Sequence, residues 1–156
     1  MRINKVLVPT DFSENAQVAV EMGYDLAHQL GSTLYLLHVQ DESTLRTAIK
    51  EGLFEENATD EILQARVKQM VEARFSELRS AHNHRDLKIE LLSLQGDPKT
   101  LITEYASEIE ADIVVIGMRG ITAASKIVSA VIGSVTEYVM RKSPCPTLVV
   151  RLDQKW

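Results

Sequence analysis

The sequence contains five short apolar runs, and longer stretches with helical periodicity separate them. The runs occupy residues 5–10, 33–40, 88–95, 112–117 and 147–152. The first, second and fourth runs are almost continuously apolar, as is typical of strands that a parallel sheet buries on both faces. The third run partly alternates between apolar and polar residues, which predicts an outer position in the sheet. This alternation of strand and helix patterns predicts an α/β fold.

The stretches between the runs have the spacing and the end signals of helices. Ser13 is a predicted N-cap, and Gly31 stands where a C-terminal glycine ends a helix. Asp97 is a second predicted N-cap, with Pro98 at the first helical position. The predicted helices span 13–31, 60–82, 97–110 and 134–142. One apolar stripe is predicted for the second of them: Leu63, Val67, Met70, Val71, Phe75 and Leu78.

The order of elements, β-α-β-α-β-α-β-α-β, predicts a doubly wound, five-stranded parallel sheet with right-handed crossovers. A length of 156 residues suits a single domain, so we expect residues 1–156 to form one domain. The segment 41–59 is long for a connection. We interpret it as a surface excursion from the fold that could act as a lid.

Charge and composition narrow the classes of partner. The net charge of −5 argues against nucleic acid as the main partner, but a ring of backbone N–H groups can still hold a small nucleotide. The one cysteine, Cys145, excludes an internal disulfide and fits a reducing cytoplasm. The N-terminus has no secretory signal pattern, and no apolar segment approaches the ~20 residues that span a bilayer. We therefore expect a cytoplasmic protein without a membrane partner.

A ligand of an open α/β sheet binds outside the carboxyl ends of the strands, where the strand order reverses. The first predicted strand ends in Pro9, Thr10 and Asp11, and the second ends in His38, Val39 and Gln40. The fourth ends in the stretch 117–120, "GMRG". These ends could line one crevice if the first and fourth strands are neighbours. Asp11 could accept hydrogen bonds from a ribose or support the helix that follows, and His38 is interpreted as a core histidine.

The segment 117–135 has two interpretations from its residues alone. Gly117 and Gly120 allow close approach of the backbone to a ligand, and Gly133-Ser134 opens a helix whose first N–H groups attract an anion. Arg119 and Lys126 could add positive charge. Glycines after strands also occur simply because tight turns require them, so spacing alone does not separate a phosphate cradle from a turn.

Several motifs in the right order resemble the universal stress protein family over essentially the whole chain. They are "KVLVPTDFSENAQVAVEMGYDLAHQLGSTLYLLHV" (5–39), "GDP" (96–98), "ADIVVIGMRG" (111–120) and "GSVTEYVMRKSPCPTLVVR" (133–151). The resemblance implies strand order 3-2-1-4-5 in a Rossmann-like fold of the adenine nucleotide alpha hydrolase type. It also implies a homodimer that pairs along the fifth strand, 147–152.

Many members of that family bind ATP through a motif of Gly, two residues, Gly, nine residues and Gly-Ser or Gly-Thr. Gly117, Gly120 and Gly133-Ser134 match its fixed positions, but the spacer 121–132 has twelve residues instead of nine. The three extra residues amount to nearly one helical turn. The nucleotide-binding residues that the resemblance implies are Pro9, Thr10, Asp11, Val39, Gly117, Arg119, Gly120, Gly133, Ser134 and Val135.

Three functions remain open from the sequence. The first is a stress-response regulator that binds ATP, with or without Mg²⁺, or a related adenine nucleotide. The second is a family member that binds no nucleotide and acts through protein contacts, which the longer spacer favours. The third is a slow ATPase. No redox cofactor is expected, and no histidine has partners at the spacing of metal ligands.

Overall fold

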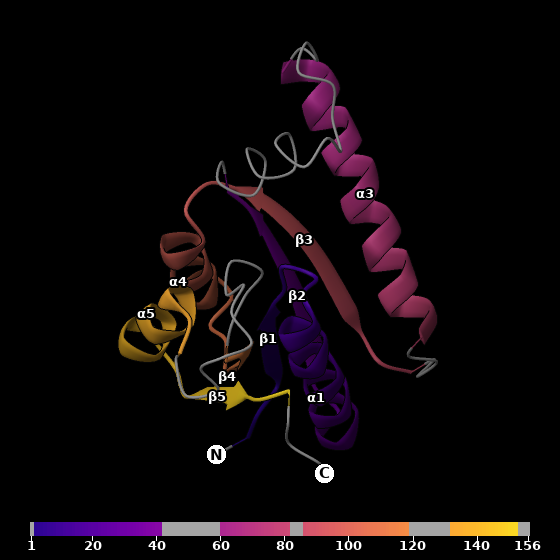
Figure 1. Cartoon of the computed structure of the whole chain (residues 1–156). Coiled ribbons are helices and arrows are strands. Elements are labelled where there is room, and N and C mark those ends of the chain that lie inside the picture. Colours follow the sequence, from indigo (N-terminus) through magenta and orange to yellow (C-terminus); the bar gives the residue numbers. More distant parts are fainter. Residues whose placement is uncertain (1, 42–59, 82–85, 119–131, 153–156) are drawn as a thin grey trace.

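The computed structural model describes residues 2–41, 60–81, 86–118 and 132–152. Five parallel strands form one sheet in the order β3-β2-β1-β4-β5 (Figure 1). They are β1 (Lys5–Pro9), β2 (Thr33–Gln40), β3 (Ile89–Gln95), β4 (Ile113–Gly117) and β5 (Thr147–Val150). The predicted fold class and strand order are confirmed, as is the outer position of β3. The fifth strand is shorter than predicted and ends at Val150.

The helices have the end signals that the sequence predicts. Ser13 caps α1 by accepting a hydrogen bond from the Ala16 N–H, and Gly31 ends α1 with a left-handed φ of 64°. Asp97 caps α4 by accepting from the Thr100 N–H. The helices are α1 (Glu14–Leu30), α3 (Asp60–Ala81), α4 (Pro98–Glu108) and α5 (Ser134–Lys142).

The helices cover the two faces of the sheet and make two apolar cores. One face of the sheet carries α1 and α3, and the other carries α4 and α5 (Figure 1). Val6 and Val8 belong to the core on the face of α1 and α3, whereas Leu7 belongs to the core on the face of α4 and α5. This alternation follows from the two-residue period of a strand. Because both faces are covered, β1 and β4 are almost wholly apolar, as the continuous runs predict.

One residue of the predicted stripe on α3 lies outside the core. Met70 keeps 46% of its surface exposed, whereas the other five residues of the predicted stripe are buried. The buried residues are spaced by three or four, so they form one narrow seam along the helix, and Met70 lies beside that seam. The predicted excursion at 41–59 is outside the described residues, apart from Asp41.

Candidate functional site

The carboxyl ends of β1 and β4 lie side by side, as the predicted crevice requires. Val6 pairs with Ile113 and Leu7 with Val114. The chain leaves β1 into α1 on one face of the sheet, and it reaches β4 from α4 on the other face. The strand order therefore reverses between β1 and β4, at the position where open α/β sheets bind ligands.

The turn after β1 is organised by its own side chains. The Thr10 N–H donates to the Leu37 carbonyl at 2.8 Å. The Thr10 hydroxyl oxygen accepts from the Phe12 N–H at 3.1 Å, and the Asp11 carboxylate accepts from the Ser13 N–H at 3.0 Å. Asp11 therefore supports the start of α1, which is one of its two predicted roles. The ribose role of Asp11 stays a prediction.

Phe12 is the residue of this turn that the sequence reasoning missed. It has a left-handed φ of 61°, a conformation that is unfavourable for a residue with a bulky side chain. Its ring centroid lies 4.8 Å from the ring of His38 and 5.5 Å from the ring of Phe75 on α3. Two aromatic contacts of this kind offset part of the backbone strain. The positive φ has no signature in the sequence, because glycine or asparagine is the usual signal.

His38 is a core histidine, as predicted. Its side chain is 6% exposed, and its Nδ1 lies 2.9 Å from the Thr10 carbonyl oxygen. Burial lowers the pKa of His38 against the opposing effects of the Thr10 hydrogen bond and of the Asp11 and Asp41 carboxylates. Because a carbonyl oxygen only accepts, Nδ1 must carry the proton that forms this bond.

The end of β4 is packed tightly against the start of α1. A Cβ atom on Gly117 would lie 2.5 Å from the Asn15 carbonyl oxygen and 3.2 Å from the Ala16 nitrogen. The Gly117 carbonyl accepts from the Thr136 hydroxyl at 2.8 Å. Gly117 has no positive φ. Gly117 therefore allows a close approach of β4 to the backbone of α1. Its predicted close approach to a ligand stays a prediction.

The first turn of α5 begins beside this point. The Gly133 N–H donates to the Met118 carbonyl at 2.9 Å, and the first helical bond runs from the Glu137 N–H to the Gly133 carbonyl. Gly133 caps α5 with φ −65° and ψ 148° and offers no side-chain cap. The N–H groups of Ser134, Val135 and Thr136 precede the first helical bond. They are therefore the donors that a helix N-terminus presents to an anion.

The structure thus brings most of the predicted residues to one end of the sheet. Pro9 and Thr10 are buried there, Asp11 is half-buried, and Ser134 is exposed. Val39 and Val135 pack against the same apolar core, on the face of α4 and α5. Arg119 and Gly120, together with most of the long spacer, lie outside the described residues.

Neither metal binding nor thiol chemistry finds support in the residues described. No cluster of three or more His, Cys, Asp or Glu side chains within 2–41, 60–81, 86–118 and 132–152 could hold a metal ion. Burial raises the pKa of the Cys145 thiol, and its sulfur lies 3.6 Å from the Ser143 hydroxyl. The raised pKa favours the protonated thiol at neutral pH. Across the same ranges, no helix has the length and apolar character to cross a membrane.

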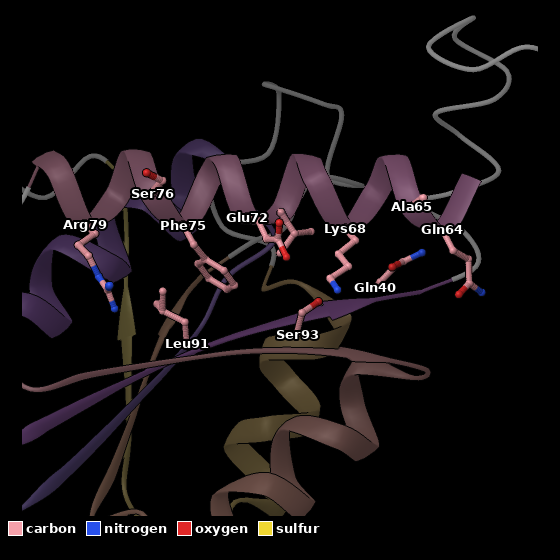
Figure 2. A pocket seen from close by; sticks show the side chains of 11 residues that line it. Gln40, Gln64, Ala65, Lys68, Glu72, Phe75, Ser76, Arg79, Leu91 and Ser93 are labelled. Carbon is pink, nitrogen blue, oxygen red and sulfur yellow. The ribbon is translucent and has the colours of Figure 1, made fainter. Parts of the chain in front are cut away.

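A cleft of about 680 Å³ lies between α3 and the β2–β3 side of the sheet, and Gln40, the last residue of β2, is among its lining residues. Figure 2 shows Lys68 of α3 reaching down toward Gln40 and Ser93, and Phe75 beside Leu91. Phe75 also contacts Phe12, so one ring separates the cleft from the turn after β1. No pattern in the sequence predicts this cleft.

Comparison with known proteins identifies the family. The model of the universal stress protein family matches residues 2–151. The universal stress protein MJ0577 of Methanocaldococcus jannaschii is 30% identical over 159 aligned positions, with 94% of each chain covered. Its solved structure superimposes with a TM-score of 0.79, at 26% identity over the structural alignment, and covers 99% of this chain and 100% of that one.

Two further solved structures share the fold at lower identity. A universal stress protein in complex with cAMP matches with a TM-score of 0.62 at 19% identity, covering 98% of this chain and 100% of its own. A family protein from Arabidopsis thaliana with AMP bound matches with a TM-score of 0.58 at 19% identity, covering 95% of this chain and 91% of its own. At this identity they show the fold alone. The family match over nearly the whole chain shows that this protein belongs to the universal stress protein family.

Proposed function

We propose that this universal stress protein binds ATP or a related adenine nucleotide at the carboxyl ends of β1, β2 and β4, and acts as a regulator in the stress response. The observation that carries the proposal is the first turn of α5. Its N–H groups have no side-chain cap, and the hydrogen bond from the Thr136 hydroxyl to the Gly117 carbonyl holds it at the end of β4, which packs against the first turn of α1. A helix N-terminus of this kind favours a phosphate group.

The proposal assigns two groups of residues to the two ends of the nucleotide. Adenine and ribose would lie near the turn after β1 and the end of β2, against Pro9, Thr10, Asp11 and Val39. The phosphates would lie at the start of α5 and the end of β4, against Gly117, Arg119, Gly120, Gly133, Ser134 and Val135. Any Mg²⁺ would be held chiefly by the phosphate oxygens, because this ion commonly binds through them.

Nucleotides in related proteins support an adenine nucleotide as the ligand. One solved relative was crystallised with cAMP and another with AMP. Both ligands share adenine, ribose and one phosphate. In this chain the Asp11 carboxylate is proposed for the ribose, and the N–H groups of Ser134 and Val135 are proposed for the phosphate.

The proposal includes a homodimer. In the described residues β5 pairs with β4 alone, so its other edge carries backbone groups without a strand partner. Leu148 is 38% exposed on this strand. An apolar edge strand that is open to pairing favours association with a second copy. We extend the proposal to a single domain over residues 1–156 that works in the cytoplasm.

Calorimetric titration with ATP and Mg²⁺ tests the proposal, on protein stripped of any bound nucleotide. The informative variant is Gly133→Val. Its backbone angles, φ −65° and ψ 148°, are allowed for valine, whereas the added side chain stands at the proposed phosphate site. The matched control is Gly31→Ala, because a Cβ there meets no atom within 4 Å and Gly31 ends α1 just before β2, at the amino ends of the strands.

The expected result is saturable binding that Gly133→Val abolishes and Gly31→Ala retains. Equal binding by both variants would remove the start of α5 from the site. A folded wild-type protein that binds no nucleotide would instead support the alternative function, in which the protein acts through protein contacts. Phosphate release, measured in the same samples, tests whether bound ATP is hydrolysed.

A further inference from the structure

His38 connects the turn after β1 to the rest of the fold, and the proposed function gives it no role. The ring is buried, and its Nδ1 donates to the Thr10 carbonyl at 2.9 Å. One neighbour of the ring is Phe12, at a centroid distance of 4.8 Å and an interplanar angle of 31°. His38 therefore contacts the turn twice, once through a hydrogen bond to its backbone and once through the ring of its strained residue.

The turn depends on support from outside itself. In two of its side-chain hydrogen bonds the Thr10 hydroxyl accepts from the Phe12 N–H and the Asp11 carboxylate accepts from the Ser13 N–H, so each bond joins residues only two positions apart. They move with the turn and do not fix it to the sheet. Two hydrogen bonds to β2 do so: the Thr10 N–H to the Leu37 carbonyl, and the His38 ring to the Thr10 carbonyl.

The second of these bonds fixes the orientation of one peptide group. The chain has no cis peptide bond among the residues described. In a trans peptide the N–H of the next residue points opposite to the carbonyl. When His38 holds the Thr10 carbonyl on its own side, the Asp11 N–H must point to the other side. The direction in which the Asp11 Cα carries its carboxylate is then also restricted.

We propose that His38 is a positioning residue of the nucleotide site. It holds the Thr10–Asp11 peptide in the orientation that places Asp11 for the ribose, and it does so through its hydrogen bond to the Thr10 carbonyl, without a contact to the nucleotide. This inference rests on the proposed function, since Asp11 belongs to the proposed site. It predicts that nucleotide affinity depends on the hydrogen-bond donor at position 38.

Two substitutions separate the hydrogen bond from the packing. In His38→Asn the side-chain amide nitrogen occupies the place of Nδ1, so the donor to the Thr10 carbonyl is kept while the ring is lost. In His38→Leu an apolar side chain keeps bulk in the core, but the donor is lost and the carbonyl is left without it. If His38 acts through packing alone, His38→Leu should bind ATP more tightly than His38→Asn. If His38 positions the turn, His38→Asn should bind ATP more tightly than His38→Leu.

The test measures ATP affinity by calorimetry, melting temperature, and hydrogen exchange of the nucleotide-free protein. We expect His38→Leu to weaken ATP binding about tenfold, the upper range for one hydrogen bond, and His38→Asn to stay near the wild-type affinity. In the nucleotide-free protein, the amides of Phe12 and Ser13 should exchange faster in His38→Leu than in His38→Asn. The amides of Val6 and Leu7 in β1 serve as the internal control.

The outcomes are distinguishable from those of the proposed function. A wild-type protein that binds no adenine nucleotide overturns the proposed function, and with it the ribose role of Asp11. Hydrogen exchange then decides alone whether His38 positions the turn. If the wild type binds ATP and the leucine variant binds it equally well, or if the asparagine variant loses as much affinity as the leucine variant, the positioning role is refuted.

Discussion

Gly117→Ala tests whether the glycine at the end of β4 is required by packing within the protein. The new Cβ would lie 2.5 Å from the Asn15 carbonyl oxygen and 2.8 Å from its carbonyl carbon. Real Cβ atoms are almost never found within 3.0 Å of such atoms, so about 0.5 Å of movement is needed. Backbone atoms make the obstacle, and no rotamer change can remove it. Either the end of β4 or the first turn of α1 must shift.

The cost follows from the behaviour of overpacked sites. Extra methyl groups in tightly packed regions destabilise by about 1–3 kcal/mol. For a chain of 156 residues, each 1 kcal/mol lowers the melting temperature by about 2–4 °C. We therefore expect a loss of about 2–12 °C by differential scanning calorimetry. The shift should also lengthen the hydrogen bond from Thr136 to the Gly117 carbonyl, because that carbonyl belongs to the displaced residue.

The comparison variant for this prediction is Gly31→Ala. It has no steric obstacle, and its cost of about 1–2 kcal/mol comes only from the left-handed φ of 64°. Hydrogen exchange should separate the two: Gly117→Ala should loosen the first turn of α1 and the start of α5, and Gly31→Ala the last turn of α1. A Gly117→Ala protein as stable as the wild type, with unchanged exchange at Asn15 and Ala16, would refute the packing argument.

Three further predictions concern stability, the helix cap and the dimer. In the folded state burial lowers the pKa of His38 below its ordinary value of 6.5, so the unfolded state binds the proton more readily. The free energy of unfolding should therefore fall as the pH drops below about 6.5, although the carboxylates of Asp11 and Asp41 oppose this effect. His38→Asn should flatten that part of the pH profile measured by urea unfolding. Asp97→Ala removes the N-cap of α4 and should cost about 1 kcal/mol in urea unfolding at pH 7. The hydrogen bond to the Thr100 hydroxyl lowers the pKa of Asp97, so this difference should shrink as the pH falls through the lowered pKa, and a difference that persists in acid would contradict the assignment. Leu148→Glu should convert a dimer to a monomer in sedimentation velocity, since like charges would meet across paired β5 edges, and an unchanged dimer would exclude this edge.

The sequence predicts the sheet well because its signals are redundant. Val6, Leu7 and Val8 place apolar side chains on both faces of the sheet. Ser13 and Asp97 mark helix starts by their side chains, and Gly31 marks a helix end by its left-handed backbone. Each signal is local, and each is confirmed. The strand order came from the family resemblance, because periodicity says nothing about which strands are neighbours.

The details of the site are less predictable because they depend on contacts between distant residues. The positive φ of Phe12 is maintained by rings from β2 and α3, which lie 26 and 63 positions further along the chain. Gly117 contacts Asn15 because β4 lies beside β1, which the residue itself does not indicate. Met70 fits the helical period but lies beside the contact seam, whose width depends on how closely α3 approaches the sheet.

The location of the nucleotide is the central claim, and amide chemical shifts measured during a titration with ATP and Mg²⁺ test it most directly. The claim predicts saturable shifts in two groups, Thr10–Phe12 and Gly133–Thr136, with one common affinity. The amides of Lys68 and Ser76, which line the cleft under α3, should stay unchanged. Saturable shifts in the cleft without shifts at the ends of β1 and α5 would contradict the account and place the ligand under α3.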